Sequence, residues 1–370
     1  MLFWFSLYAY TPFVNPELIN MGVTASVMGF IGGAYGFTQM LLRIPVGIGS
    51  DRWQKKFFIC MGCLSAVLAA LTMLVFHNPA GFLIGRALGG VAASSWVPFT
   101  VMYASYYKAE HTTRAITMIN LASQLGRFIS FLLAAWLTTH FGARAAFVLA
   151  LCVGIAGLVM SLFIKETSGD NSKKPASVKA LLAIGKDKNV LLCSVLAILV
   201  QIIAFATKTT FTLNHAVSIG ATQAQLSFTQ LALLSSGIIL SFLLGRFILK
   251  HFEAKHLVVL GFIITIVYCI IVPITGTMPQ LYLVQMLGGI GNTLTFSLLM
   301  GLCVQNVDNS KRGAAMGFFQ SIYGLGMTIG PVMMGLIIDF SSMRYGFFTM
   351  AFIAAIAAVL SMRYLKRKAA

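Results

Sequence analysis

The chain alternates between long apolar runs and short polar turns. A helix needs about 20 apolar residues to cross a hydrocarbon core about 30 Å thick, and the runs have this length. We predict twelve spans, at residues 2–19, 24–49, 57–76, 82–106, 115–139, 145–164, 190–213, 224–250, 256–275, 280–304, 313–338 and 345–364. The runs are continuous and do not alternate in short segments, which excludes an outer-membrane β-barrel.

The composition supports an all-α membrane protein. Hydrophobic residues make up 58% of the 370 residues and charged residues only 9%, whereas a soluble domain has about 25% charged residues. A soluble enzyme, a disordered tail and a secreted disulfide scaffold are therefore excluded. No Walker P-loop, H-E-x-x-H motif or nucleophile elbow occurs in the sequence, so we do not expect an enzyme. The six cysteines lie in apolar runs and are interpreted as core side chains, so neither a metal site nor a cofactor is expected.

One long polar stretch divides the chain. We predict an N-terminal six-helix bundle (residues 1–164), a cytoplasmic central loop (165–189) and a C-terminal six-helix bundle with a short cytoplasmic tail (190–370). Most of the 26 Lys and Arg residues fall in loops on one side of the membrane, and only Arg144 and Arg344 lie in loops on the other side. The positive-inside rule then places both termini and the central loop in the cytoplasm.

The net charge of +17 is explained by this topology, so no nucleic-acid partner is expected. The expected partners are the lipid bilayer, a small-molecule substrate and a coupling ion, which the sequence leaves open between a proton and another ion. We expect a multi-pass monomer in the plasma or inner membrane.

The two halves resemble each other at an offset of about 200 residues. The segment Arg86-Ala-Leu-Gly-Gly-Val91 matches Gln285-Met-Leu-Gly-Gly-Ile290, and Arg144-Ala-Ala-Phe147 matches Arg344-Tyr-Gly-Phe347. Six spans in each half give both halves the same orientation, which is a parallel repeat about an axis along the membrane normal. Transporters built in this way bind substrate between the halves and rock around it.

A charged motif lies between the second and third spans, and it reads Gly47-Ile-Gly-Ser-Asp51-Arg52-Trp-Gln-Lys55-Lys56. It resembles the signature loop of the major facilitator superfamily, G-x-x-x-D-R-x-G-R/K-R/K, with Gln54 in place of the second glycine. The resemblance implies two pseudo-symmetric six-helix bundles and secondary transport by alternating access. It also implies an inner gate of Gly47, Asp51, Arg52 and Lys55, in which Asp51 caps the N-terminus of the eleventh span. The alternative is that this cluster only anchors the second span at the membrane surface.

Four cations lie inside predicted spans: Arg43, Arg86, Arg127 and Lys208. A charge at the bilayer centre costs at least about 2.5–3.5 kcal/mol and usually faces a cavity. Arg127 lies near the midplane, whereas the other three are close enough to a span end to reach an interface. We predict that Arg127 contacts substrate; the alternative is a buried strut that hydrogen-bonds between helices. The candidate substrate-cavity residues, which are polar or aromatic side chains inside predicted spans, are Arg127, Gln124, Arg43, Arg86, Trp96, Gln201, Lys208 and Asn292.

All nine acids fall at span ends or in loops. Proton-coupled drug exporters of the similar family usually keep a carboxylate within the membrane and a Gly-Pro motif in the fifth span, and both are missing here. Cations without acids favour a transporter of a small anionic or polar organic solute. The alternative is a proton-coupled drug or sugar exporter. Its coupling candidate is Glu17, the only acid at the outer end of the first half's cavity helices.

Overall fold

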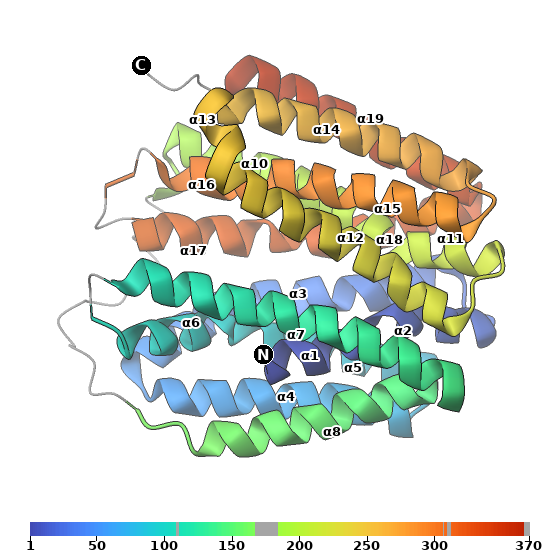
Figure 1. Cartoon of the computed structure of the whole chain (residues 1–370), viewed down its shortest axis with the longest axis horizontal. Helices are drawn as coiled ribbons and strands as arrows, with labels where there is room; N and C mark the ends of the chain where they lie inside the picture. Colours follow the sequence, from blue (N-terminus) through green and yellow to red (C-terminus); the bar gives the residue numbers. More distant parts are fainter. Residues whose placement is uncertain (109–110, 167–183, 306, 309–311, 366–370) are drawn as a thin grey trace.

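The computed structural model describes residues 1–108, 111–166, 184–305, 307–308 and 312–365, which form helices and no strands (Figure 1). The elements of the first half are α1 (Leu2–Ala9), α2 (Thr11–Asn20), α3 (Ala25–Arg52), α4 (Lys55–Val75), α5 (Pro79–Ser94), α6 (Trp96–Ser105), α7 (Thr112–Phe141) and α8 (Arg144–Leu162). Those of the second half are α10 (Lys188–Ile203), η2 (Ala204–Phe211), α11 (Thr212–Ser218), α12 (Gln223–Leu243), η3 (Leu244–Ile248), α13 (Leu249–His251), α14 (Ala254–Ile271), η4 (Val272–Ile274), α15 (Met278–Asn292), η5 (Thr293–Ser297), α16 (Leu298–Gln305), α17 (Arg312–Ile322), α18 (Gly324–Phe340) and α19 (Met343–Tyr364).

Consecutive helices that continue into each other form single spans, for example α1–α2, α5–α6 and α10–η2–α11. Ten stretches, each made of one helix or of consecutive helices, are long and apolar enough to cross a membrane. With α1–α2 and α3, the described residues form twelve spans, and their bounds agree with the predicted ones to within a few residues. The predicted all-α fold with twelve spans is therefore confirmed.

Prolines explain two breaks that the hydrophobic pattern did not predict. The first span breaks at Tyr10, just before Pro12 at the start of α2. The fourth span breaks at Ser95, and Pro98 follows in the first turn of α6. Proline has no N–H to donate to the carbonyl four residues earlier, so the helical hydrogen-bond ladder is interrupted at both places.

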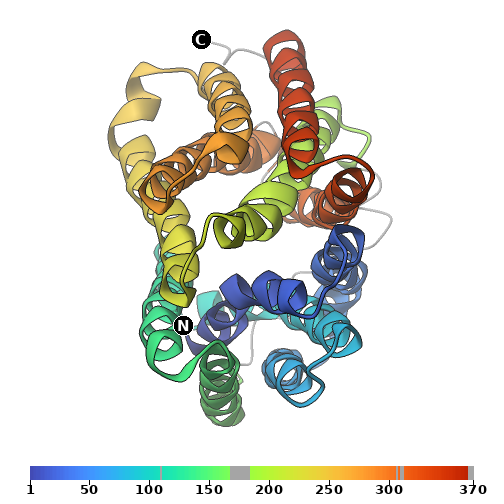
Figure 2. The same ribbon diagram turned by 90° about the vertical axis from the view of Figure 1, so that its right-hand side faces the viewer.

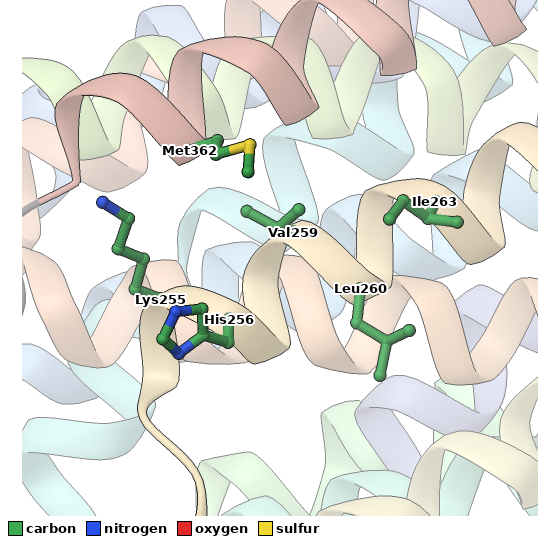
Figure 3. Close-up of a pocket in the computed structure, with 6 residues that line it drawn as sticks. All are labelled: Lys255, His256, Val259, Leu260, Ile263 and Met362. Carbon is green, nitrogen blue, oxygen red and sulfur yellow. The ribbon is translucent and has the colours of Figure 1, made fainter.

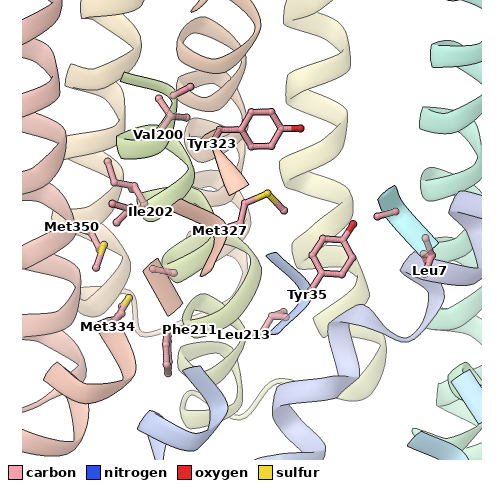
Figure 4. Packing of buried hydrophobic residues seen from close by; sticks show 14 of the residues in the cluster. Leu7, Tyr35, Val200, Ile202, Phe211, Leu213, Tyr323, Met327, Met334 and Met350 are labelled. Carbon is pink, nitrogen blue, oxygen red and sulfur yellow. The ribbon is translucent and has the colours of Figure 1, made fainter. Parts of the chain in front are cut away.

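The two halves face each other across the middle of the molecule, as the view in Figure 2 shows. One hydrophobic cluster includes Tyr35 of the first half together with Phe211, Leu213 and Met327 of the second (Figure 4). The division into residues 1–164 and 190–370 stays a prediction, because residues 167–183 lie outside the described part of the chain.

The most extensive contact between the halves is that of α3 and α18. A Cβ atom on Gly29 would lie 2.3 Å from the carbonyl oxygen of Pro331, and one on Gly33 would lie 2.7 Å from that of Thr328. Glycine is therefore required at both positions, since any side chain would push the two helices apart.

Candidate functional site

Each of the four intramembrane cations lies over an aromatic ring. The pairs, with the distance from the cation centre to the ring centroid, are Arg43 with Tyr323 (5.9 Å), Arg86 with Tyr35 (4.8 Å), Arg127 with Trp4 (4.6 Å) and Tyr8 (4.7 Å), and Lys208 with Tyr268 (5.6 Å). A cation–π contact contributes about 0.5–1 kcal/mol at an exposed site and about 2 kcal/mol or more when desolvated. The rings thus offset part of the cost of burying these charges.

Arg43, Arg86 and Lys208 lie close enough to a span end to reach an interface, but the structure buries their side chains within the bundle. Their exposed fractions are 7%, 7% and 3%. Packing decided the outcome, because a ring on a neighbouring helix holds each cation inside the bundle.

Arg127 lies on α7, and its side chain extends toward the first span. Its guanidinium faces Trp4 and Tyr8 of α1, it forms no hydrogen bond or ion pair with the described residues, and its Nε is buried. Trp96 meets Trp4 edge-on, with the ring centroids 5.2 Å apart. Two predicted cavity residues, Arg127 and Trp96, therefore converge on Trp4. Gln124 lies one turn before Arg127 and is partly buried.

Arg86 extends this group toward the other half. Its guanidinium lies over the ring of Tyr35 of α3. The Tyr35 ring stacks on Phe205 of η2, with a centroid distance of 6.2 Å. We call Trp4, Tyr8, Tyr35, Arg86 and Arg127 the N-half cluster. It borders the interface between the halves, because η2 belongs to the second half.

Lys208 is the corresponding cation of the second half. It lies in η2, a stretch of π-helix, and such segments are frequent at functional sites. The Tyr268 hydroxyl beneath it donates a hydrogen bond of 3.1 Å to Gln285 Oε1, while Gln285 Nε2 is buried without a partner. Of the other predicted residues, Asn292 also has a buried oxygen without a partner, and Gln201 packs against α18.

The halves are hydrogen-bonded at one end of the bundle, which we call the Asn15 end. Asn15 Nδ2 donates to Asn214 Oδ1 at 2.7 Å. The Asp339 carboxylate, at the end of α18, accepts the N–H groups of Ala25 (2.9 Å) and Ser26 (2.8 Å), which begin α3. A carboxylate of the second half therefore caps a helix of the first half.

The opposite end, which we call the Asp51 end, holds the predicted inner gate. Asp51 is exposed and has no hydrogen bond or ion pair with the described residues, and Gly47 and Arg52 lie near it on α3. The backbone N–H of Lys55 donates to Glu166 Oε1 at 2.6 Å. Residues 309–311, directly before α17, lie outside the described part of the chain. The predicted contact of Asp51 with the eleventh span therefore stays a prediction.

Glu17 has a partner that the sequence analysis missed. Its Oε2 lies 2.9 Å from His77 Nε2, and the Glu17 side chain is 12% exposed. Both residues belong to the first half, so this pair does not join the halves. The coupling role of Glu17 stays a prediction.

The aromatic partners were also missed, although the sequence carried a signal for them. Trp4 and Tyr8 are four residues apart. Tyr35, Gln39 and Arg43 also follow one another at intervals of four residues. Side chains at this spacing share one face of a helix. The spacing predicts a common face but not which cation of another helix lies opposite it.

These features define a helical membrane protein with many spans, and its family follows from comparison with known proteins. The sequence profile of the Major Facilitator Superfamily matches residues 1–215 and 190–370. The chain belongs to the Major Facilitator Superfamily, as the motif at Asp51 predicted.

Relatives and solved structures agree with this family. The chain is 22% identical over 332 residues to an uncharacterised transporter of this superfamily from Methanocaldococcus jannaschii, covering 86% of this chain and 84% of the relative. It is 22% identical over 343 residues to the quinolone resistance protein NorA of Staphylococcus aureus, covering 89% and 85%. A point mutant of the nucleoside transporter NupG has a similar fold, with a TM-score of 0.81 at 12% identity over 99% of this chain and 98% of NupG. An inward-facing, occupied bacterial homologue of the human lysosomal transporter Spinster has a TM-score of 0.77 at 13% identity, covering 97% and 93%.

Proposed function

We propose that this protein is a secondary transporter that moves a small anionic or polar organic solute by alternating access. The observation that carries the proposal is Arg127, whose guanidinium lies over two rings with no carboxylate paired to it among the described residues. Every acid among the described residues lies at or near the end of a helix or between helices. An anionic solute would therefore supply the counter-charge that the chain itself lacks at this depth.

The N-half cluster suits a solute that carries a carboxylate or phosphate. A guanidinium binds such groups with two parallel hydrogen bonds, which an ammonium cannot do. The rings of Trp4 and Tyr8 offer apolar faces beside that charge. Lys208 and Gln285 give the second half a cation and a free hydrogen-bond donor. A solute between the halves could thus engage both of them.

The two ends supply the gates of this proposal. At the Asn15 end, Asp339 holds the start of α3. We propose that Asp51 holds the start of α17 when that contact opens, so that α3 and the eleventh span carry one latch at each end. The cation-rich loops place the Asp51 end in the cytoplasm in this proposal.

Conservative substitution at Arg127 tests the substrate role. We expect Arg127→Lys in proteoliposomes to weaken binding of the transported solute at least tenfold, and Arg127→Ala to weaken it further, because the two-point contact is lost. Arg144→Lys, an exposed arginine at the start of α8, is the matched control and should leave binding unchanged. Uptake would be measured over a panel of organic anions, neutral solutes and cations. Preference for cations, or equal binding by Arg127→Lys, would refute the proposal.

A second candidate is a proton-coupled drug exporter, and the similarity to NorA over 89% of the chain favours it. Glu17 would be the proton carrier in that case. A quinolone should then accumulate in proteoliposomes only when a proton gradient is present. Glu17→Gln should abolish this accumulation but leave the exchange of quinolone across the membrane intact. Gradient-driven accumulation that survives in Glu17→Gln would exclude this role.

A further inference from the structure

A groove lies between α14 and α19 at the Asp51 end (Figure 3). Its volume is about 310 Å³, and its lining residues are Lys255, His256, Val259, Leu260, Ile263 and Met362. Val259 and Met362 face each other between the two helices, and Lys255 extends from the first turn of α14 at one end of the gap. The groove is thus basic at one end and apolar along the rest.

The apolar part of the groove is open to the surroundings of the bundle. Leu260, Ile263 and Met362 are 45%, 48% and 67% exposed. In a membrane, these side chains contact acyl chains, while the basic end lies at the level of the lipid headgroups. A matching ligand has an anionic head and an apolar tail. We propose that the groove binds an acidic phospholipid, with its phosphate at Lys255 and His256 and one acyl chain along Val259, Ile263 and Met362.

The charges around the head position support this ligand. The Lys255 ammonium forms no ion pair with the described residues. Glu253 Oε2 lies 3.6 Å from His256 Nδ1, and it is the acid that the structure places at this helix end. Because both residues are exposed, this pair is weak. A lipid phosphate would give Lys255 its missing counter-charge.

In the first half, the chain itself supplies a negative charge at the position that corresponds to Lys255. The offset of 200 residues that aligns Arg144 with Arg344 also aligns Lys55 with Lys255. In the first half, Glu166 accepts the Lys55 backbone N–H at 2.6 Å. The sequence has a lysine, not an acid, at the position that matches Glu166, and the Lys255 N–H has no hydrogen bond among the described residues. The second half therefore leaves this anion position to a ligand.

The packing around Lys55 in the first half is also tighter than the packing around Lys255 in the second half. Ile59 of the first half is 1% exposed, whereas the matching Val259 is only partly buried. The side chain at this position is thus buried in the first half, whereas in the second half it lines the groove. The proposal does not depend on which solute the protein transports.

Native mass spectrometry of the full chain tests this site, with phosphatidylglycerol or phosphatidylcholine titrated into the detergent. We expect phosphatidylglycerol to bind at least tenfold more tightly. Lys255→Gln should weaken its binding about fivefold, since one interfacial cation is lost. Met362→Trp should fill the groove and weaken binding at least tenfold. If that variant lowers the unfolding midpoint, Ile263→Trp takes its place.

Lys56→Gln is the matched control, because Lys56 lies at the same end of the bundle on α4 and is not among the residues that line the α14–α19 groove. It should leave phosphatidylglycerol binding within twofold of the unmodified chain. Equal binding of the two lipids, or equal losses from Lys255→Gln and Lys56→Gln, would overturn the proposal. Full displacement of the lipid by millimolar glycerol phosphate would also overturn it, because the site would then take a free anion and no acyl chain.

Discussion

Each end of α3 lies beside a carboxylate, but in the described part of the chain only the carboxylate at the Asn15 end accepts hydrogen bonds from a helix of the other half. At the Asn15 end, a carboxylate at the end of α18 caps the first N–H groups of α3, and an asparagine pair joins the halves beside it. At the Asp51 end, a carboxylate at the end of α3 is exposed and forms no hydrogen bond or ion pair with the described residues, although Lys55 lies close enough to interact with it electrostatically. In our proposal Asp51 caps the start of α17 when the Asn15 end opens, so that α3 and the eleventh span would be joined by one capping acid at a time.

Such a device gives each conformation its own stabilising contact. A carboxylate at a helix N-terminus contributes about 0.3–1 kcal/mol, and up to about 2 kcal/mol when partly buried. Removing one acid should therefore shift the equilibrium between the states severalfold without unfolding the protein. The sign of that shift distinguishes the two acids.

The largest effect should come from locking the Asn15 end. Asn15→Cys together with Asn214→Cys, with the six native cysteines replaced, should be bridged by a short bifunctional thiol reagent. We expect transport to fall at least twentyfold and to return on reduction, because the end can no longer open. Either single variant, treated in the same way, is the control. Undiminished transport in the bridged protein would show that this end does not open.

Asp51→Asn should have the next largest effect. We expect it to fold normally but to lower the transport rate about tenfold, because the state with the Asn15 end open loses its cap. A cysteine at position 214, which is 7% exposed as Asn214, should then react more slowly with a thiol reagent. A normal transport rate in the purified variant would remove the gate role of Asp51.

Asp339→Asn should shift the same equilibrium in the opposite direction. Loss of the cap on Ala25 and Ser26 should raise the labelling rate at position 214 about fivefold, which corresponds to about 1 kcal/mol. Glu253→Gln, on a surface away from this end, serves as the control. Slower labelling in Asp339→Asn would contradict the comparison. The double variant with Asp51→Asn should label at a rate between the two single variants.

Glu17→Gln should have the smallest effect on the equilibrium between the two states. Its partner His77 belongs to the same half, so the labelling rate at position 214 should stay within twofold of its starting value. A larger change would show that the Glu17–His77 pair also helps to hold the Asn15 end closed.

The spans could be predicted from the sequence because continuous apolar runs and the charge of the loops are local signals. The family could be predicted because the motif from Gly47 to Lys56 is contiguous. The candidate site could be predicted only in part. Depth along a span identified Arg127, but the rings of Trp4 and Tyr8 became its neighbours through packing between helices distant in sequence.

The cap at Asp339 could not be predicted for the same reason. In the sequence Asp339 is one of several acids at span ends, and its partners Ala25 and Ser26 lie more than 300 residues earlier. Neither the offset between the halves nor the motif at Asp51 points to that pairing. It follows from the antiparallel packing of α3 and α18, which the glycines at positions 29 and 33 permit.

The cations held over rings also have an electrical consequence. Moving one elementary charge through a membrane potential of 100 mV changes its energy by about 2.3 kcal/mol. Arg43, Arg86, Arg127 and Lys208 face rings, which do not cancel their charge as carboxylates would. Any reorientation that shifts them within the field is therefore voltage-dependent even when no solute is bound. A bound anion would cancel part of that charge, so membrane voltage would act differently on the loaded and the empty carrier.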